Sequence, residues 1–390
     1  MNVLILTPEF PPQFGGIGTH CYWMATHWSR EADVTVIAPA VAGTRTCHEW
    51  PFRVVRVRPT RSRLVRLWRS ARGVRRLMAE KRFDIAYIAH WRTCGVAFRL
   101  ATAGRPDSPQ YIQAVHGGEV LYMLRRRMQA PSRLLFRMTT SRADMLIALG
   151  AYQAGLLREL GVARDRVFVS PEGVDLSSFL PPDTEDVLER LRQRHRLDGK
   201  RVLLTVARLA SHKGHDAVIR ALPEILAQVP DAVYLIVGSG ATADALRRLA
   251  DEMGVAEHVR FAGFVPEDEL AGYYYLCDVF VMPSREVDGD TEGFGIVFAE
   301  AAACAKPTIG GRTGGIVEAV EEGKTGLLVE PTATSEIVHA AVTLLTDQDL
   351  AGRMGEAGRR RVMDHMQYKD IAANILAACR DGAGSLGSVA

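Results

Sequence analysis

The sequence predicts an α/β protein built from two doubly wound, Rossmann-like domains that face each other across a cleft. Short, nearly continuous apolar runs rich in β-branched residues recur along the chain, as expected of parallel strands buried on both faces. Amphipathic segments of helical length separate these runs. The alternation pauses near residue 182 and then starts again, which indicates two successive domains.

The predicted strands of the first domain are residues 3–7, 34–38, 84–89, 111–115 and 145–149. Those of the second domain are residues 201–207, 233–237, 259–261, 279–282 and 307–309. Residues 17–31 show the helical pattern between strands, with Cys21, Met24, Ala25 and Trp28 on one face. Pro181 and Pro182 end the first pattern, and Thr184 can cap the next helix. We therefore expect domains at residues 1–182 and 183–365, and a frayed tail at 381–390.

Composition excludes several classes of protein. The chain has 390 residues, of which 47% are hydrophobic and 24% charged, so it is neither disordered nor collagen-like. No apolar run approaches the roughly 18 residues of a spanning helix, and residues 1–10 favour a first strand over a signal peptide. The six cysteines are scattered without a C-x-x-C pair, which predicts buried free thiols.

Charge is unevenly distributed along the chain. Residues 1–180 hold 26 Lys and Arg against 13 Asp and Glu, whereas the whole chain holds 48 against 45. The first half is therefore basic and the second acidic. This asymmetry indicates an anionic partner for the first half, such as nucleic acid, an anionic membrane or a phosphorylated substrate.

Two features of the first domain follow predicted strands. Gly15 and Gly16 precede a predicted helix, and a glycine turn there lets backbone N–H groups approach an anion. A dinucleotide fingerprint fits poorly, because its third glycine would fall at Cys21. His116 follows another strand and precedes two glycines, so it can project into the cleft.

In the second domain, charged residues lie at or near several of the predicted turns. Arg208 and Lys213 share one strand-to-helix loop, and two cations there suit a diphosphate leaving group. Gly238 forms another strand-to-glycine turn. Glu292 precedes a helix that we expect to begin near Phe294, and its free N–H groups can bind phosphate. Glu300 lies between two alanines further along that helix, where a buried carboxylate requires a partner.

Taken together, these motifs resemble the retaining glycosyltransferases of family 4, whose fold is called GT-B. The E-x(7)-E spacing of Glu292 and Glu300, the pair Arg208 and Lys213, and the dipeptide 116–117 occur in the family's order. The resemblance covers nearly the whole chain. It implies a nucleotide-sugar donor, no bound metal, and a helix at residues 366–380 that crosses back to the first domain. Residues 288–290 spell D-x-D, but we expect them to form only a loop.

By this resemblance, each candidate residue receives an expected role. The catalytic group comprises His116, Arg208, Lys213 and Glu292. The donor-binding group comprises Gly15, Gly16, Gly238, Phe264, Val265, Phe294, Gly295, Ile296, Val297 and Glu300. Glu300 would bind the ribose hydroxyls, Glu292 the sugar, and His116 the transferred sugar near its anomeric carbon.

Two details refine the resemblance. The loop at residues 285–291, with the Gly-Phe-Gly-Ile-Val-Phe run at 293–298, is most similar to the phosphatidylinositol-mannoside mannosyltransferase branch, which favours GDP-mannose as donor. Relatives that use UDP-glucose or UDP-GlcNAc share the same core motifs. One departure is Glu172, which stands where the family's P-N-G-V-D segment has Asn.

A basic amphipathic helix is predicted at residues 62–81. We expect Leu64, Leu67, Trp68, Ala71, Val74 and Met78 on one face, and Arg66, Arg69, Arg72 and Arg76 on the other. Such a helix can lie on an anionic leaflet, and Arg125–Arg127, Arg133 and Arg137 form a second cluster. We therefore expect a lipid-linked or glycan acceptor in cell-envelope or polysaccharide synthesis, and a peripheral location at the inner leaflet. A solvated outer helix remains the alternative.

Other classes of protein fit less well. A nucleic-acid-binding protein would account for the basic half, but aromatic residues are not interleaved with the arginines as stacking requires. A nucleotide-sugar 2-epimerase would share the two-domain cleft and would release free sugar without an acceptor. A catalytically silent sugar-nucleotide-binding module is disfavoured because both glutamates and both cations are present.

Overall fold

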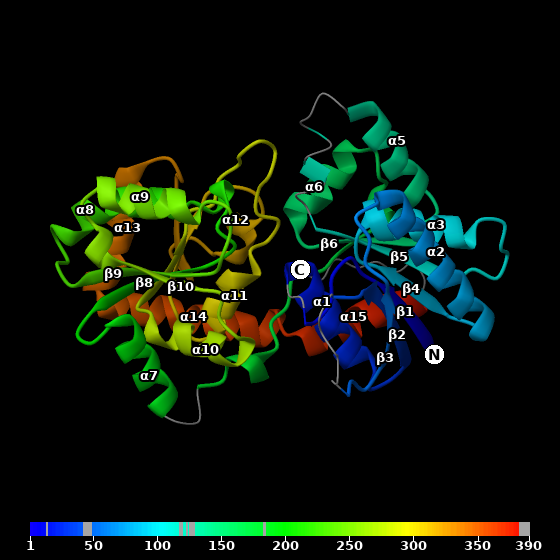
Figure 1. Ribbon diagram of the computed structural model, residues 1–390, viewed down its shortest axis with the longest axis horizontal. Helices are drawn as coiled ribbons and strands as arrows, with labels where there is room; N and C mark the ends of the chain where they lie inside the picture. Colours follow the sequence, from blue (N-terminus) through cyan, green and yellow to red (C-terminus); the bar gives the residue numbers. More distant parts are fainter. Residues whose placement is uncertain are drawn as a thin grey trace. The chain divides into compact units, whose positions relative to one another are not determined.

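The computed structural model describes residues 1–12, 15–41, 49–116, 120–121, 124, 129–181 and 185–381. Contacts divide the chain into two compact units (Figure 1). Unit 1 comprises Met1–Glu172 with Tyr368–Ala390, and unit 2 comprises Gly173–Gln367. The chain therefore passes between the units after Glu172 and again after Gln367. The expected boundary between residues 182 and 183 lies outside the described part of the chain.

Unit 1 is built on a parallel sheet, which confirms the predicted α/β class. Its strand order in the described residues is β3-β2-β1-β4-β5-β6-β7. The strands are β1 (Asn2–Leu6), β2 (Asp33–Pro39), β3 (Arg53–Val57), β4 (Ile85–Ile88), β5 (Gln110–Val115), β6 (Met145–Ala148) and β7 (Val167–Val169). All five predicted strands are present. The two edge strands, β3 and β7, were not predicted.

Helices of unit 1 cover this sheet. They are α1 (Gly16–Trp28), α2 (Arg63–Glu80), the π-helical turn η1 (Trp91–Gly95), α3 (Val96–Thr102), α5 (Gln129–Thr140), α6 (Ala151–Glu159), the 3-10 turn η2 (Arg164–Arg166) and α15 (Tyr368–Asp381). Ser62 caps α2 by accepting a hydrogen bond from the Val65 N–H at 3.4 Å. The last helix, α15, packs beside α1 (Figure 1), where the Trp28 indole donates to the Ala372 carbonyl at 2.8 Å.

Unit 2 has a second parallel sheet, in the order β10-β9-β8-β11-β12-β13. The strands are β8 (Arg201–Val206), β9 (Ala232–Val237), β10 (Val259–Gly263), β11 (Val279–Met282), β12 (Thr308–Gly311) and β13 (Gly326–Val329). The helices and turns are η3 (Leu176–Phe179), α7 (Glu185–His195), η4 (Ser211–Lys213), α8 (His215–Leu226), α9 (Ala243–Glu252), η5 (Ala256–His258), α10 (Glu267–Leu276), α11 (Ile296–Ala303), α12 (Ile316–Ala319), α13 (Thr334–Thr346) and α14 (Gln348–His365). All five predicted strands are again present, and β13 is additional.

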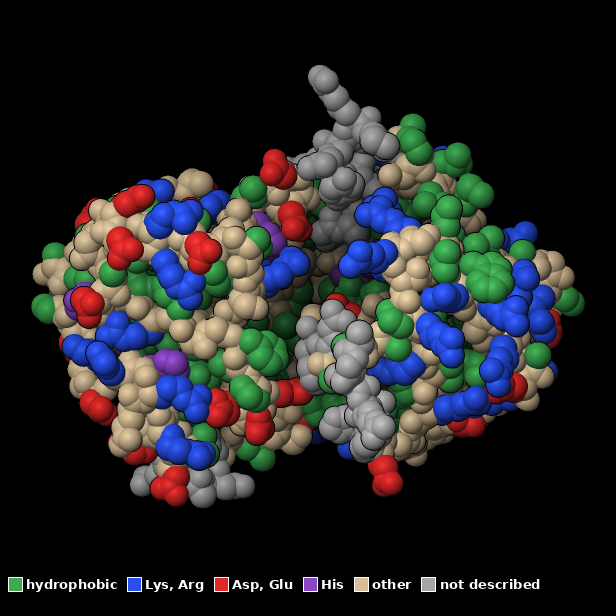
Figure 2. Space-filling model, in the orientation of Figure 1, with side chains coloured by type: hydrophobic (Ala, Val, Ile, Leu, Met, Phe, Trp, Pro, Cys, Tyr) green, Lys and Arg blue, Asp and Glu red, His purple; other side chains and the backbone are tan. Residues whose placement is uncertain are grey.

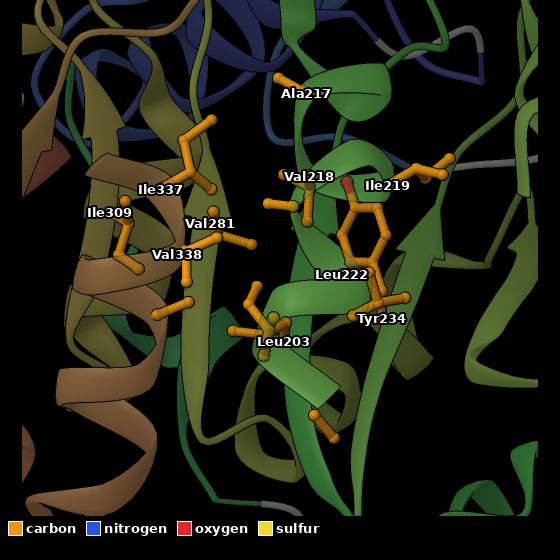
Figure 3. Close-up of a cluster of buried hydrophobic side chains, with 14 of the residues drawn as sticks. Leu203, Ala217, Val218, Ile219, Leu222, Tyr234, Val281, Ile309, Ile337 and Val338 are labelled. Atoms are coloured by element: carbon orange, nitrogen blue, oxygen red, sulfur yellow. The ribbon is translucent and has the colours of Figure 1, made fainter. Parts of the chain in front are cut away.

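The core of unit 2 lies between its sheet and the helices α8 and α13. Leu203, Tyr234 and Val281 project from neighbouring strands toward Leu222 and Ile337 of these helices (Figure 3). Each of these side chains is fully buried. Burial of such a side chain stabilises the fold by about 1.5–3 kcal/mol, so the packing holds the strand ends and their loops in place.

The described cysteines are buried, as the sequence predicted. Cys21, Cys94, Cys277, Cys304 and Cys379 are all buried, and no disulfide joins any two of them. Cys47 lies outside the described residues. Within the described chain, no helix is both long enough and apolar enough to cross a membrane.

Candidate functional site

The candidate donor residues of unit 2 lie on loops at the carboxyl ends of its strands. Arg208 and Lys213 follow β8, Gly238 follows β9, and Glu292 follows β11. These ends meet at one edge because the sheet is parallel. In an open parallel sheet, this is the edge at which ligands bind.

Glycines allow these loops to pack against one another. A Cβ on Gly238, which has φ 131°, would lie 2.0 Å from the Ala207 carbonyl oxygen. A Cβ on Gly214, which has φ 80°, would lie 2.2 Å from the Pro283 carbonyl oxygen. The loop after β8 is therefore held between the loops after β9 and β11, at distances that no side chain allows.

Lys213 and Glu292 form an ion pair within this edge. The Lys213 ammonium donates to Glu292 Oε2, and the two side chains are only 15% and 16% exposed. The sequence predicted both residues but not their pairing. A lysine held beside a carboxylate is pre-ordered, so it can meet a developing phosphate charge with little reorganisation. Arg208 is exposed on the same loop.

Further polar contacts fix the segment that carries Glu292. The Arg285 guanidinium donates to both carboxylate oxygens of Asp216, at 2.9 and 2.8 Å. His212 Nδ1 lies 3.4 Å from Asp290 Oδ2. Burial and the nearby Lys213 ammonium lower the His212 pKa, so this imidazole is mainly neutral at pH 7. These contacts tie the loop after β11 to the start of α8.

Residues 288–290 form a turn, as the sequence predicted. Val287 and Asp290 exchange two backbone hydrogen bonds of 3.0 and 2.9 Å, and Asp288 and Gly289 have φ values of 54° and 80°. This is the geometry of a type I′ turn. No group of three or more His, Cys, Asp or Glu that could hold a metal ion occurs within the described residues.

The amino end of α11 faces the same loops. The helix begins at Ile296, two residues after the predicted start, and Gly295 precedes it with φ 81°. The buried Phe294 anchors this turn, and a Cβ on Gly315 would lie 1.7 Å from the Gly293 carbonyl oxygen. Backbone N–H groups at a helix amino end favour an anion. Ile296 and Val297 present such groups in a partly exposed position.

Glu300 lies further along α11 and has the partner that its burial required. The Tyr274 hydroxyl donates to Glu300 Oε2 at 2.7 Å. Burial raises the Glu300 pKa to about 7, because the hydrogen bond offsets only part of the desolvation. Tyr274 was not among the predicted site residues. Phe264 and Val265 follow β10, and the Phe264 side chain is 76% exposed.

In unit 1, His116 follows the carboxyl end of β5 and lies beside His20. The two ring centroids are 5.8 Å apart, with the planes at 82°. His20 Nε2 lies 2.7 Å from the Tyr87 hydroxyl oxygen, and His20 Nδ1 lies 3.4 Å from Glu172 Oε1. Gly117, Gly118 and Glu119 lie outside the described residues. Sequence reasoning missed His20 and Tyr87.

The turn at Gly15 and Gly16 has an acidic neighbour that was not predicted. Gly16 starts α1, and the Gly18 N–H donates to Glu9 Oε1 at 3.0 Å. A Cβ on Gly15 would lie 2.5 Å from the same oxygen. The Glu9 carboxylate therefore occupies the position at the amino end of α1 where an anion was expected.

The predicted basic helix is present as α2, and its apolar face is buried over only part of its length. Ala71, Val74, Leu77 and Met78 are buried, whereas Leu64 and Trp68 are 77% and 59% exposed. The predicted apolar face is therefore buried in the second half of the helix and largely exposed in its first turns. The same stripe runs through the whole helix, but only its second half is covered by the core of unit 1.

The four candidate arginines of α2 make different contacts. Arg72 lies over the Trp68 ring at 5.4 Å, and Arg76 pairs with Glu80 at 3.0 Å. Arg66 and Arg69 donate to backbone carbonyls of the preceding loop. Figure 2 shows arginine and lysine side chains interspersed with exposed hydrophobic ones over the helices of unit 1. On α5, Arg133 and Arg137 alternate with Leu134 and Met138, which are 61% and 59% exposed. Arg125–Arg127 lie outside the described residues.

Two parallel α/β units with these loops define a glycosyltransferase of the GT-B fold, and comparisons with known proteins agree. The chain superposes on the Anabaena protein HepE in complex with UDP and glucose with a TM-score of 0.83, at 20% identity, over 98% of this chain and all of that one. It superposes on a sucrose-phosphate synthase of Thermosynechococcus elongatus with a TM-score of 0.81, at 21% identity, over 97% and 98%. At these identities, the similarity concerns the fold alone.

Sequence comparison identifies the family. Residues 14–178 match the family described as Glycosyltransferase Family 4, and residues 188–361 match Glycosyl transferases group 1. A GDP-mannose-dependent α-(1-6)-phosphatidylinositol monomannoside mannosyltransferase of Mycolicibacterium smegmatis is 34% identical over 96% of this chain and 97% of that relative. A GDP-mannose-dependent monoacylated α-(1-6)-phosphatidylinositol monomannoside mannosyltransferase of Corynebacterium glutamicum is 29% identical over 93% of this chain and 93% of that relative. The chain belongs to the family 4, group 1 glycosyltransferases.

Proposed function

We propose that this glycosyltransferase moves mannose from GDP-mannose, with retention at the anomeric carbon, to a mannosylated phosphatidylinositol lipid. The observation that carries the proposal is the likeness to relatives with this printed activity, at 34% identity across nearly the whole of both chains. The loop chemistry of unit 2 supports it, because two cations and a free helix amino end suit a nucleoside diphosphate.

The donor residues receive roles from their chemistry. Glu300 of α11 binds the ribose hydroxyls, and the backbone at residues 294–297 binds phosphate. Arg208 and Lys213 neutralise the diphosphate. Glu292 orients the sugar and holds Lys213 through their ion pair. Gly238, Phe264 and Val265 line the nucleotide, while Gly15 and Gly16 approach the diphosphate from unit 1. Glu9 must release the Gly18 N–H for that approach.

The transfer then needs no enzyme nucleophile. The bond between the anomeric carbon and the phosphate oxygen breaks as the acceptor hydroxyl attacks from the same face. The hydroxyl proton passes to the departing phosphate oxygen, so the products are the glycoside and GDP. Lys213 and Arg208 stabilise the negative charge on that phosphate, and His116 contacts the sugar near its anomeric carbon.

The acceptor is a lipid, and α2 carries the protein to it. Leu64 and Trp68 present apolar surface beside Arg66 and Arg72. This combination suits an anionic leaflet, in which apolar side chains enter the interface and arginines meet headgroups. The cytoplasmic leaflet carries such lipids, so we place the protein there as a peripheral protein.

A donor and acceptor assay tests the proposal. The protein is incubated with GDP-mannose and vesicles that contain phosphatidylinositol monomannoside, and the lipid is analysed by mass spectrometry. We expect one added hexose, and no addition when UDP-glucose or UDP-GlcNAc replaces GDP-mannose. Transfer only from a UDP-sugar would overturn the donor assignment. Release of free sugar with no lipid product would instead favour the 2-epimerase alternative.

A further inference from the structure

We infer that Glu172 and His20 form a buried pair that positions the His116 imidazole, so that Glu172 is a positioning residue for sugar transfer. The inference rests on the role proposed above for His116. All three residues belong to unit 1. Glu172 is also the residue at which this chain departs from the family pattern, since a carboxylate replaces an amide there.

The first step of the argument is the contact between Glu172 and His20. Glu172 Oε1 lies 3.4 Å from His20 Nδ1, and the residues are 5% and 1% exposed. Glu172 Oε2 has no hydrogen-bond partner among the described residues. A buried carboxylate is costly without a compensating positive group. The His20 imidazole is the nearest such group in the described chain, and His116 contributes as well.

The second step is that His20 is held on its other sides too. Its Nε2 lies 2.7 Å from the Tyr87 hydroxyl oxygen. Its ring also meets the Tyr368 ring, with centroids 5.7 Å apart and planes at 69°. Glu172 and Tyr368 are the unit 1 residues next to the two crossings of the chain into unit 2. The unit 1 residues at both crossings therefore contact the His20 imidazole.

The third step connects His20 to His116. The two rings meet edge to face, with centroids 5.8 Å apart. His20 Nδ1 lies within ion-pair distance of the Glu172 carboxylate but makes no hydrogen bond among the described residues. A neutral His20 with its proton on Nδ1 would face that carboxylate, and its Nε2 would then accept from the Tyr87 hydroxyl. In its protonated form, both nitrogens donate. Glu172 therefore determines which ring nitrogens of the imidazole beside His116 carry a proton.

The electrostatics agree with this geometry. Burial alone would raise the Glu172 pKa, but the His20 and His116 imidazoles together lower it. The other titratable groups that face the pair in the described chain are Cys21 of α1, Tyr87 of β4 and Tyr368 of α15. Burial raises the pKa values of Cys21 and Tyr87, so both stay neutral near pH 7.

The experiment compares wild-type protein with Glu172→Gln, which keeps the shape and removes the charge. The matched control is Glu31→Gln, at an exposed carboxylate of unit 1 that pairs only at the surface with Arg380. Long-range ¹H–¹⁵N spectra give the tautomer of each imidazole. In Glu172→Gln we expect the tautomer populations of His20 and His116 to change, because the carboxylate that faces His20 Nδ1 is lost, whereas the control leaves them unchanged.

Kinetics supply the functional readout. We expect Glu172→Gln to lower kcat by roughly 10-fold and to move the acidic limb of its pH profile to lower pH. The KM for GDP-mannose should change less than kcat, because most of the proposed donor contacts lie in unit 2 and only Gly15, Gly16 and His116 belong to unit 1. A lower melting temperature with an unmoved pH profile would mean a purely structural role. Because the imidazole spectra need no turnover, they decide the inference even if GDP-mannose is not the donor.

A second variant keeps the test decisive if Glu172→Gln folds poorly. In His20→Asn, the amide nitrogen takes the place of Nδ1 and preserves the contact with Glu172, but the ring beside His116 is lost. If Glu172 acts mainly through His20, adding Glu172→Gln to His20→Asn should change the His116 spectrum less than Glu172→Gln changes it alone. Fully additive effects of the two substitutions on the His116 spectrum would overturn the inference.

Discussion

The hydroxyl of Tyr274 donates a 2.7 Å hydrogen bond to Glu300 Oε2, and it joins α10 to α11 inside unit 2. Glu300 is 8% exposed, and its burial raises its pKa to about 7. The carboxyl is therefore divided between its neutral and ionised forms at neutral pH. An ionised carboxylate binds hydroxyl groups more strongly than a neutral one does, so protonation of Glu300 should control nucleotide affinity.

Binding of GDP-mannose should strengthen as pH rises through neutrality. If the ionised form of Glu300 accepts the ribose hydroxyls, the Kd should fall by roughly 10-fold between about pH 6 and pH 8. Glu300→Gln should bind more weakly and lose most of this dependence. Calorimetry without acceptor measures both, and a wild-type Kd that is constant over this range would remove the ribose role from Glu300.

Stability should depend on pH in the opposite direction. The Glu300 pKa is raised in the folded protein from its ordinary value of 4.5 to about 7. Between these values the folded state holds a proton that the unfolded state has lost, so the free energy of unfolding falls as pH rises. Relative to wild type, Glu300→Gln should therefore gain melting temperature between about pH 4.5 and pH 7. A constant difference across that range would contradict the assignment of this titration to Glu300.

The ion pair of Lys213 and Glu292 predicts separate effects on binding and transfer. Lys213→Ala should lower kcat by roughly 10²–10³ if the lysine stabilises the departing phosphate. Glu292→Gln should impair transfer far more than it weakens GDP affinity, because its proposed contact is with the sugar and it reaches the diphosphate only through Lys213. Single-turnover rates and GDP calorimetry on both variants test these roles. Near-wild-type turnover in Lys213→Ala, or an equal loss of GDP affinity in Glu292→Gln and Glu300→Gln, would show that the roles are misassigned.

The central strands were predictable because burial on both faces leaves a plain apolar run in the sequence. The edge strands β3, β7 and β13 were not predicted, although the edge strand β10 was. In β3, arginine residues interrupt the valines and most side chains are only partly buried, and β7 is only three residues long. Such segments become strands because a neighbouring strand offers hydrogen bonds, which the local sequence does not encode.

Some residues of the candidate site were likewise predictable from the local sequence, and others were not. The burial of Glu300 followed from its alanine neighbours, but Tyr274 could not be found, because it reaches Glu300 from another helix. His20 was also missed, since it gains its role from Tyr87 and Glu172, which are distant in the sequence. Glu9 was missed although its partner Gly18 lies only nine residues away, because that contact depends on how the loop before α1 folds back. Glu172 stood out only as a departure from the family pattern. Local sequence indicates which residue must have a partner, and the fold supplies the partner.

Close packing at the amino end of α11 predicts a sensitive glycine. In Gly315→Ala, the new Cβ would lie 1.7 Å from the Gly293 carbonyl oxygen. The turn before α11 must move, and we expect a loss of at least about 2 kcal/mol in unfolding free energy together with weaker GDP binding. The control is Gly352→Ala on α14, where a Cβ meets nothing within 4 Å. That variant should be as stable as wild type or slightly more stable. Equal melting temperatures for the two variants would contradict the packing argument.

The surface of α2 predicts binding to anionic vesicles. Trp68 and Leu64 are exposed beside Arg66 and Arg72. Wild-type protein should sediment with vesicles that contain anionic lipid and should be released as salt rises from about 0.05 to 0.5 M. Replacement of Arg66, Arg69, Arg72 and Arg76 by Gln should abolish sedimentation and barely change the melting temperature, because exposed charges contribute little to folding.

A matched variant separates this patch from net charge. Arg220, Arg248, Arg353 and Arg360 are exposed on unit 2, and replacing them by Gln removes the same charge elsewhere. That control should sediment like wild type, since headgroup attraction acts over about one Debye length. The α2 variant should also lose activity on a lipid acceptor in vesicles but keep it on a short, water-soluble acceptor. If wild-type protein stays in the supernatant with anionic vesicles even at low salt, these arginines are a solvated helix face and the membrane proposal is wrong.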